Sequence, residues 1–281
     1  MKNVIFGHVC IDKNTSEHTS YIAAGSPAMF IQRIFAQFPK CTTTIIAPYG
    51  KDFLPYSKNI NLFPAKPNSK KTLVYENISK NGKRIQRAYN RANAQPIKID
   101  DNIKNILSQS DIVFIAPLLP NLSKKYFSKI KSSVRKKSLI VLLPQGFYRN
   151  FDKQDNVIVR EFKEADEVLQ YVDIVIVSDQ DCPKMISVCK KWSKNNQNLI
   201  TVVTRGKKGV TIIKNNKKLN VPSLPVAEKD VVDSVGAGDT FSAAFAYQFK
   251  KTDNIFEAGK FANSIARQKL FFKLNDLKIS F

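Results

Sequence analysis

Residues 233–241 have the sequence DSVGAGDTF and lead directly into the apolar run SAAFAYQF. Gly236 and Gly238 allow the backbone to turn tightly and to approach a ligand, since no Cβ is in the way. The apolar run predicts a buried helix over residues 236–249, with the amides of both glycines and Ala237 at its N-terminus. Unpaired amides and the helix dipole make such a terminus an anion site. The stretch therefore predicts a place where a phosphate-sized anion is held.

Asp239 follows these glycines in the first turn of the predicted helix. A carboxylate beside an anion site can accept a hydroxyl proton as that oxygen attacks phosphorus, which is typically worth about 10²–10⁴-fold in rate. Phosphoryl transfer otherwise needs mainly alignment and charge stabilisation. The competing interpretation is that Asp239 only caps a helix behind a glycine-rich turn. The pattern favours a small-molecule kinase in which Asp239 is the general base.

Short apolar runs rich in Val and Ile recur on both sides of this motif, and amphipathic stretches separate many of them. Continuous apolar runs predict strands in a sheet that is covered on both faces. The predicted strands are 4–6, 43–46, 112–115, 139–143, 174–177 and 199–203. The predicted helices are 26–37, 122–134, 181–194 and 236–249. This alternation predicts an α/β fold with a mainly parallel central sheet, in one domain spanning residues 1–281.

Two segments depart from this rhythm. Residues 13–24 are polar and then extended, and residues 60–95 contain two strand-like runs. Between these runs, Asn81-Gly82 is a strong hairpin signal. We expect the two segments to form a small β-lid that excludes water from the site, although a plain surface hairpin is the alternative.

The charge balance is strongly basic, with 45 Lys and Arg against 23 Asp and Glu and a net charge of +22. Such a field attracts anionic substrates. The lysines are scattered and no nucleic-acid recognition motif accompanies them, so a nucleic-acid partner is not predicted. No apolar run is long enough to cross a bilayer, so a membrane partner is not predicted either.

The four cysteines, Cys10, Cys41, Cys182 and Cys189, show neither metal-ligand nor redox spacing, and the two histidines add no zinc pattern. The first residues lack a signal-peptide pattern and read as a strand. We therefore expect a cytoplasmic enzyme with reduced thiols.

At this point the sequence resembles the ribokinase-like (PfkB) family of carbohydrate and nucleoside kinases. The resemblance implies a ribokinase-like fold, ATP and Mg²⁺ as cofactors, and a small-molecule acceptor. For residues 233–239 it implies that Asp239 is the catalytic base and that the amides of Gly236, Ala237 and Gly238 form the anion hole. Many relatives pair through their lids, which implies a homodimer through residues 72–90. The alternative is a monomer, because Lys and Arg on this segment can block pairing at its edge.

The resemblance extends to the substrate side. The run GHVCID at residues 7–12 is similar to the family's first strand with its acidic residue, which implies that Asp12 holds substrate hydroxyls. The run AGSPA at 24–28 is similar to the family's Gly-Gly turn with alanine in place of the first glycine, and it implies substrate contacts for Gly25 and Ser26. The run LPQGFYR at 143–149 is similar to the inositol kinase branch, and it implies contacts for Gln145 and Arg149.

On the nucleotide side, TRGKKG at residues 204–209 is similar to the family's Thr-x-Gly-x-x-Gly turn. The run SDQD at 178–181 stands where the family has Asn-x-x-Glu, so the acidic role passes to Asp181, through water to Mg²⁺, while the amide is lost. The residues implied to bind the nucleotide are Ser178, Asp181, Thr204, Gly206, Gly209 and Asn263.

The acceptor implied by these motifs is a carbohydrate or an inositol-like cyclic polyol. A nucleoside stays open, with Phe30, Tyr75 or Tyr89 as an aromatic wall, and so does a sugar phosphate. A hydroxymethylpyrimidine-type kinase is a further alternative, although such chains usually lack a β-lid. The last alternative is a catalytically weak relative that binds or regulates.

Overall fold

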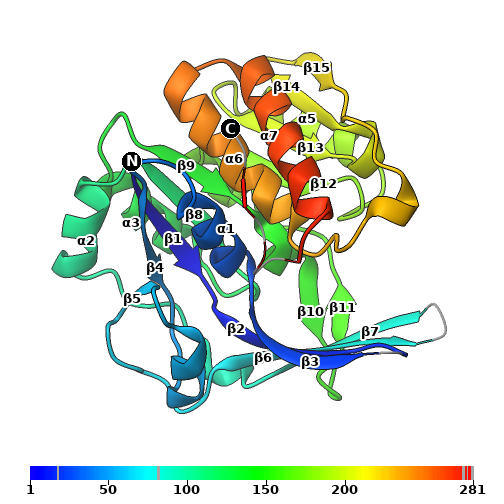
Figure 1. Ribbon diagram of the computed structural model, residues 1–281. Helices are drawn as coiled ribbons and strands as arrows, with labels where there is room; N and C mark the ends of the chain where they lie inside the picture. The colour runs from blue at the N-terminus through cyan, green and yellow to red at the C-terminus, as the bar shows by residue number, and fades with distance from the viewer. Residues whose placement is uncertain (18, 81–82, 274–275, 277, 280–281) are drawn as a thin grey trace.

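The computed structural model describes residues 1–17, 19–80, 83–273, 276 and 278–279 (Figure 1). Its centre is a sheet of nine strands, here called the large sheet. In spatial order the strands are β15 (Lys217–Val221), β14 (Val210–Lys214), β13 (Ile200–Thr204), β12 (Ile174–Ser178), β9 (Leu139–Leu142), β8 (Ile112–Ala116), β1 (Lys2–Gly7), β4 (Thr42–Ile46) and β5 (Asn61–Phe63). All neighbours from β13 to β5 are parallel, whereas β14 and β15 are antiparallel. The predicted mainly parallel sheet is confirmed.

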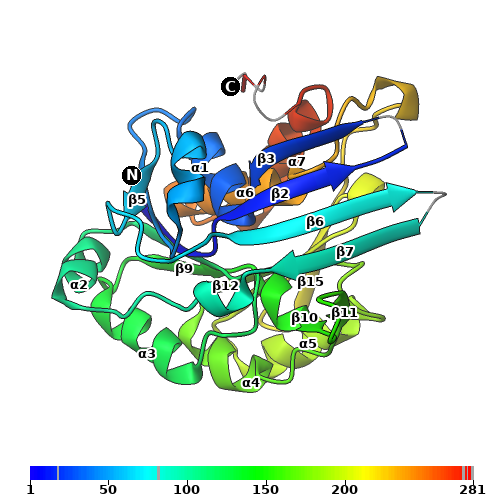
Figure 2. The same ribbon diagram turned by 90° about the horizontal axis from the view of Figure 1, so that it is seen from below.

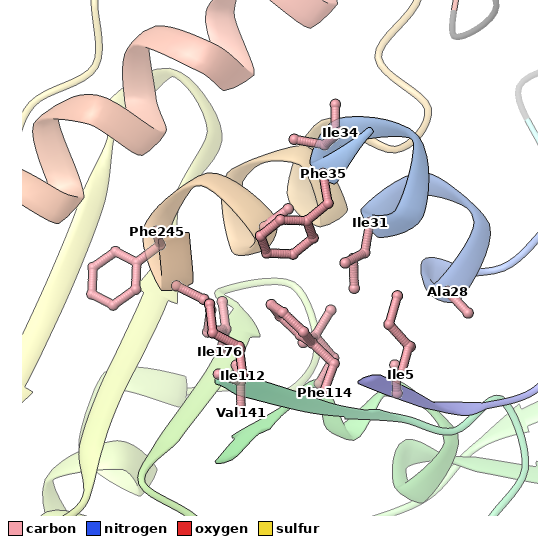
Figure 3. Close-up of a cluster of buried hydrophobic side chains, with 14 of the residues drawn as sticks. Ile5, Ala28, Ile31, Ile34, Phe35, Ile112, Phe114, Val141, Ile176 and Phe245 are labelled. Carbon is pink, nitrogen blue, oxygen red and sulfur yellow. The ribbon is translucent and has the colours of Figure 1, made fainter. Parts of the chain in front are cut away.

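Helices cover both faces of the large sheet. One face carries α1 (Pro27–Phe35), α6 (Ala237–Thr252) and α7 (Ile255–Leu270); the other carries α2 (Asp101–Ser108), α3 (Lys124–Ser133), α4 (Ala165–Val168) and α5 (Met185–Asn195). Alternate strand residues enter opposite cores, so that Ile5 packs with α1 and α6 while Val4 packs with α2 and α3. Figure 3 shows Phe35 above Phe114 in the first of these cores, with Phe245 to their left. Burial of each such side chain contributes about 1.5–3 kcal/mol, which explains why these strands read as continuous apolar runs.

A second sheet of four strands, here called the small sheet, extends from one side of the large sheet (Figures 1 and 2). Its order is β3 (Ser20–Gly25), β2 (Cys10–Thr15), β6 (Leu73–Lys80) and β7 (Lys83–Tyr89). The two outer pairs are antiparallel hairpins, and β2 and β6 join them in parallel. Strands were expected in both segments. The predicted Asn81-Gly82 turn and His18 lie outside the described residues.

A short hairpin of β10 (Arg149–Phe151) and β11 (Val157–Val159) follows the large sheet's β9 and braces the small sheet. Asn156 forms a bridge with Arg87 on β7, and Asp155 accepts a hydrogen bond from the amide of Ala88 at 3.0 Å. Asp155 also pairs with Arg91 at 2.5 Å. The sequence does not predict this hairpin, because each of its strands is only three residues long and a polar loop separates them.

Short 3₁₀ helices complete the described elements. They are η1 (Lys51–Tyr56), η2 (Arg91–Asn93), η3 (Pro144–Tyr148), η4 (Leu169–Tyr171), η5 (Gly206–Lys208) and η6 (Glu228–Asp230). None of the helices in the described part of the chain has both the length and the apolar character that crossing a membrane requires. The four cysteines are free thiols.

Candidate active site

Most of the predicted site residues follow the carboxyl ends of parallel strands. Arg149 follows β9, whereas Ser178 and Thr204 are the last residues of β12 and β13. In open α/β sheets, ligands bind in the crevice outside these strand ends. Residues 233–239, here called the glycine turn, lead into α6 and include its first residues.

The glycine turn is held in a conformation that only glycine adopts easily. Gly236 is the N-cap of α6 with φ 77°, and a Cβ on it would lie 2.0 Å from the buried ring of Phe30. Thr240 donates its amide to the carbonyl of Gly236 at 2.8 Å, which starts the helix. The amide of Ala237 donates to Ser234 O at 3.2 Å. Among the described residues, the amides of Gly236 and Gly238 have no backbone acceptor, so they are the members of the predicted anion hole that are open to a ligand.

Asp239 lies in the first turn of α6 with its side chain half-buried. Burial raises the pKa of Asp239 to about 7, and the positive charge of Arg149 opposes this rise. No described residue donates a hydrogen bond to its carboxylate. A carboxylate with a pKa near neutrality and an unused proton-accepting face is suited to general base catalysis.

Arg149 begins β10 and lies among the acidic groups of the site. Its guanidinium stacks over the ring of Tyr75, 4.8 Å from the ring centroid, and its Nη1 is buried with no partner among the described residues. Its charge also lowers the pKa of Asp181, against a larger rise caused by burial. A buried, unpaired donor costs about 1–3 kcal/mol, so an anionic or hydroxyl ligand at Nη1 would be favoured.

Asp12 and Gly25 form one unit of the small sheet. The carboxylate of Asp12 fills the space beside Gly25, where a Cβ would lie 1.9 Å from Asp12 Oδ2. Cys10 Sγ donates to Asp12 Oδ1 at 3.2 Å. The strand register places Asp12 beside Tyr75, the residue on which Arg149 stacks. The structure thus links Asp12, Tyr75, Arg149 and Asp239 in one neighbourhood.

The other two predicted substrate residues are Ser26, at the start of α1, and Gln145, on η3. Ser26 is buried with φ 101°, and its hydroxyl caps α1 by accepting the amide of Met29 at 3.4 Å. Gln145 lies on η3 with its side chain exposed.

On the nucleotide side, Ser178 and Asp181 form a compact turn. Asp181 Oδ2 accepts the amide of Ser178 at 2.8 Å, and Ser178 Oγ accepts the amide of Gln180 at 3.2 Å. Thr204 pairs with Ser178 in the strand register and donates its hydroxyl to Val177 O at 3.2 Å. These three residues therefore lie together at the carboxyl ends of β12 and β13.

Gly209 and Asn263 both lie against the end of β15. A Cβ on Gly209 would lie 2.2 Å from Val221 O, and Asn263 donates its amide to Val221 O and Pro222 O at 3.2 and 2.9 Å. Asn263 is buried and already uses its donor. Gly206 has φ 50° and open space around it.

The acidic residues of the site suit a Mg²⁺ ion only when it is bound together with a phosphate ligand. In the described part of the chain, no three His, Cys, Asp or Glu side chains gather as in a protein metal cage. Mg²⁺ usually keeps several waters and takes one or two carboxylates together with substrate phosphates. Asp181, oriented by the amide of Ser178, is a carboxylate suited to that arrangement.

Two residues of this neighbourhood were missed as parts of the site. Tyr75 was considered only as an aromatic wall, whereas it is the platform for Arg149. Lys269 is fully buried and binds the start of the glycine turn. A helical spacing would have revealed it, because Ala258, Ala262, Ile265 and Lys269 lie on one buried stripe of α7.

Residues 47–271 match the family model described as pfkB family carbohydrate kinase. The chain is 44% identical to ribokinase of Bacillus subtilis over 64 residues, which are 23% of this chain and 21% of that protein. It is 27% identical to the bifunctional protein HldE of Sulfurimonas denitrificans over 190 residues, 62% of this chain and 38% of that one. The chain thus spans less than half the length of these curated relatives.

Solved structures share the fold across almost the whole chain. A pyrophosphate-dependent kinase in the ribokinase family, complexed with a pyrophosphate analog and myo-inositol, has a TM-score of 0.75 at 18% identity and covers 95% of this chain and 94% of that one. The Arabidopsis thaliana ribokinase complexed with ribose and ATP has a TM-score of 0.72 at 18% identity, with coverages of 96% and 93%. These likenesses establish the ribokinase-like fold.

Proposed function

Because this chain belongs to the pfkB family of carbohydrate kinases, we propose that it is an ATP-dependent phosphotransferase acting on a hydroxyl of a carbohydrate or an inositol-like cyclic polyol. The observation that carries the proposal is the half-buried carboxylate of Asp239 at the start of α6, whose pKa is raised by burial to about 7 although the charge of Arg149 opposes the rise. A helix cap on the surface would have neither property.

In the proposed reaction the acceptor hydroxyl lies against Asp239. Asp239 takes the hydroxyl proton as the oxygen forms its bond to the terminal phosphorus, and the bond from phosphorus to the bridging oxygen of the donor breaks. The leaving diphosphate keeps that electron pair. The amides of Gly236 and Gly238, with Ala237 between them, stabilise the charge on the transferring group, and the guanidinium of Arg149 helps to neutralise it.

The donor site is proposed at the ends of β12 and β13. Ser178, Thr204, Gly206 and Gly209 shape the turn against which the phosphates lie, and Asn263 supports this wall through Val221 and Pro222. Asp181 would hold Mg²⁺ through water. When bound with the donor, Mg²⁺ supplies charge neutralisation of the phosphate oxygens.

The acceptor site is proposed between the small sheet and η3. Asp12 accepts hydrogen bonds from two hydroxyls, and Gly25 brings its backbone close to the ring of a polyol. Arg149 can donate its unpaired Nη1 to a further hydroxyl. Ser26 and Gln145 flank these groups at the start of α1 and on η3.

Gly25→Ala is expected to raise the acceptor KM by about 10–100-fold, because the new Cβ displaces the Asp12 carboxylate and removes charged hydrogen bonds worth about 1.5–3 kcal/mol. Steady-state kinetics with a saturating donor measures the change. Asp12→Asn, which leaves Gly25 alone, should raise KM similarly. An unchanged KM in Gly25→Ala would remove Asp12 from the acceptor site.

We propose that the small sheet, which contains segments 13–24 and 60–95 in part, is the lid over this acceptor site. Tyr75 on β6 holds Arg149, and Asp12 on β2 faces the same neighbourhood. The lid would exclude water, which otherwise competes with the acceptor for the phosphoryl group.

The lid is also the proposed contact of a homodimer, but through β3 rather than through residues 72–90, where the sequence placed the contact. At one edge of the small sheet β7 is bridged to Asn156, whereas β3 at the other edge exposes Tyr21 by 52% and Ile22 by 57%. Sedimentation equilibrium should therefore give a dimer that Ile22→Lys dissociates, because charges block strand-edge pairing. Ile85→Lys on β7 is the control and should stay dimeric. A monomeric wild type would contradict this contact.

The experiment that tests the function is phosphate transfer to a panel of inositols, sugars, nucleosides and sugar phosphates. Each acceptor is offered Mg·ATP and, separately, magnesium pyrophosphate, because a neighbour of this fold uses the latter. We expect turnover on a cyclic polyol or sugar with ATP. Turnover on a nucleoside or sugar phosphate alone would replace the acceptor class, and no turnover with tight donor binding would favour a binding or regulatory role.

A further inference from the structure

Lys269 is the most deeply buried charge in the described part of the chain. It lies near the end of α7, and its side chain has 0% exposure. Its ammonium donates to three oxygens: Asp233 Oδ2 at 2.9 Å, Asp233 O at 3.0 Å and Phe272 O at 3.0 Å. All three N–H donors are therefore used, which is the condition under which a buried ammonium is tolerated.

Asp233, the first residue of the glycine turn, connects Lys269 to the rest of the turn. One carboxylate oxygen accepts from Lys269, and the other accepts the amide of Val235 at 2.9 Å. The amides of Val232 and Asp233 both donate to Leu270 O, at 2.8 and 3.3 Å. The end of α7 and the start of the glycine turn are thus fastened by a buried charge, a carboxylate and two backbone bonds.

The oxygens around Lys269 are of the kind that surround a bound cation. They are one carboxylate oxygen and two carbonyl oxygens, and they come from both sides of the junction between α7 and the turn. An apolar side chain here would leave all of them without a donor, although the rest of the stripe is Ala258, Ala262 and Ile265. The position therefore favours a side chain with three N–H donors, and the ammonium of Lys269 supplies them together with a positive charge.

We propose that Lys269 is a positioning residue whose ammonium is a built-in cation for the glycine turn. It fixes Asp233, Asp233 fixes Val235, and these contacts set the direction of the amides at Gly236 and Gly238. The turn then needs no cation from solvent to keep its shape. This inference rests on the proposed function only for its effect on turnover, since the shape of the turn can be measured without it.

The test compares Lys269→Ala with Lys260→Ala, a control at an exposed position of the same helix. Amide hydrogen exchange is followed over residues 232–241, with and without added methylammonium, and kcat and KM are measured beside it. In Lys269→Ala we expect exchange in this segment to be faster by about tenfold or more, and kcat to fall by about 10²-fold with acceptor KM within roughly threefold. Methylammonium, which fits the vacated space, should restore part of both. Lys260→Ala should match the wild type.

Two results would overturn the proposal. The first is unchanged exchange in Lys269→Ala, and the second is equally faster exchange over the whole chain with no methylammonium rescue, which would make Lys269 a general stabiliser. If Lys269→Ala does not fold, the test is made on the wild type by replacing all small cations in the buffer with tetramethylammonium. Amide exchange in the glycine turn should then stay unchanged. Faster exchange would mean that the turn needs an external cation, which would overturn the proposal. Wild type without turnover would refute the proposed function and leave these exchange results intact.

Discussion

Replacing Asp239 with asparagine is expected to lower kcat by about 10²–10⁴-fold, with the acceptor KM within roughly threefold. Asparagine fills the same space in the first turn of α6 but cannot accept the hydroxyl proton. The hydrogen bond to the acceptor survives, because the amide oxygen still accepts, and so binding changes little. Initial rates of phosphate transfer, with wild type and variant side by side, measure the loss.

The matched control is Asp253→Asn, at the opposite end of the same helix. Asp253 is exposed and has φ 51°, a left-handed conformation that asparagine tolerates well. It should keep wild-type turnover. Equal turnover in wild type and Asp239→Asn would remove Asp239 from the reaction.

The raised pKa of Asp239 adds a pH signature to this prediction. Since burial raises it to about 7, the base is protonated below that pH, and kcat/KM of the wild type should fall about tenfold per pH unit there. The residual activity of Asp239→Asn should lack this limb. A wild-type profile that is flat down to pH 5 would contradict the assignment.

The same shift predicts that Asp239→Asn stabilises the fold at high pH. A raised folded-state pKa means that the folded state is penalised for carrying the charge; the penalty is absent below the ordinary carboxyl value near 4 and complete above about 7. Discounted for partial exposure, it is about 1–3 kcal/mol. Thermal unfolding at pH 8 should therefore favour the variant, and the two proteins should converge near pH 3.

The parts of the fold that the sequence predicts are those set by local patterns. Strands such as β8 and β9 are buried on both faces, so their apolar runs are unbroken, and the glycines at positions 236 and 238 mark the start of α6. The parallel pairing of β2 with β6 joins segments far apart in the chain, and no local pattern encodes that register. The short β10–β11 hairpin is stabilised by contacts with β7, which the sequence does not reveal.

The same division holds in the candidate site. The glycine turn, Asp239 and Arg149 were predicted because spacing and motif identify them one residue at a time. The stacking of Arg149 on Tyr75 and the pairing of Lys269 with Asp233 are contacts between distant residues. Asn263 shows the opposite case, since a position carried over from the family has its amide engaged with Val221 and Pro222. A motif thus indicates which residues matter, whereas the fold determines what each one contacts.

Gly238→Ala is expected to lower kcat/KM by about 10²–10³-fold without weakening the fold. Apart from its chain neighbours and the nearby backbone of α6, a Cβ on Gly238 meets no described atom within 4 Å, and its backbone is helical, so no described contact requires glycine there. Alanine is favoured over glycine in helices by up to about 1 kcal/mol, and stability should stay level or rise. The open space is where we place the transferring phosphoryl group, which the new methyl group would obstruct. Donor kinetics and thermal unfolding of one preparation measure both effects.

Gly236→Ala gives the matched comparison, because its glycine is required by the fold itself. At φ 77° a side chain is strained, and its Cβ would lie 2.0 Å from the Phe30 ring, so we expect a loss of about 1–3 kcal/mol in the free energy of unfolding. The two glycines, which Ala237 separates, should therefore differ in their effects. Gly236→Ala loses stability and activity together, whereas Gly238→Ala loses activity alone. If Gly238→Ala turns over like the wild type, the space beside its amide holds no reacting group and the anion hole must lie elsewhere. If it loses stability as Gly236→Ala does, the glycine serves packing, and the turn carries no evidence for phosphoryl transfer.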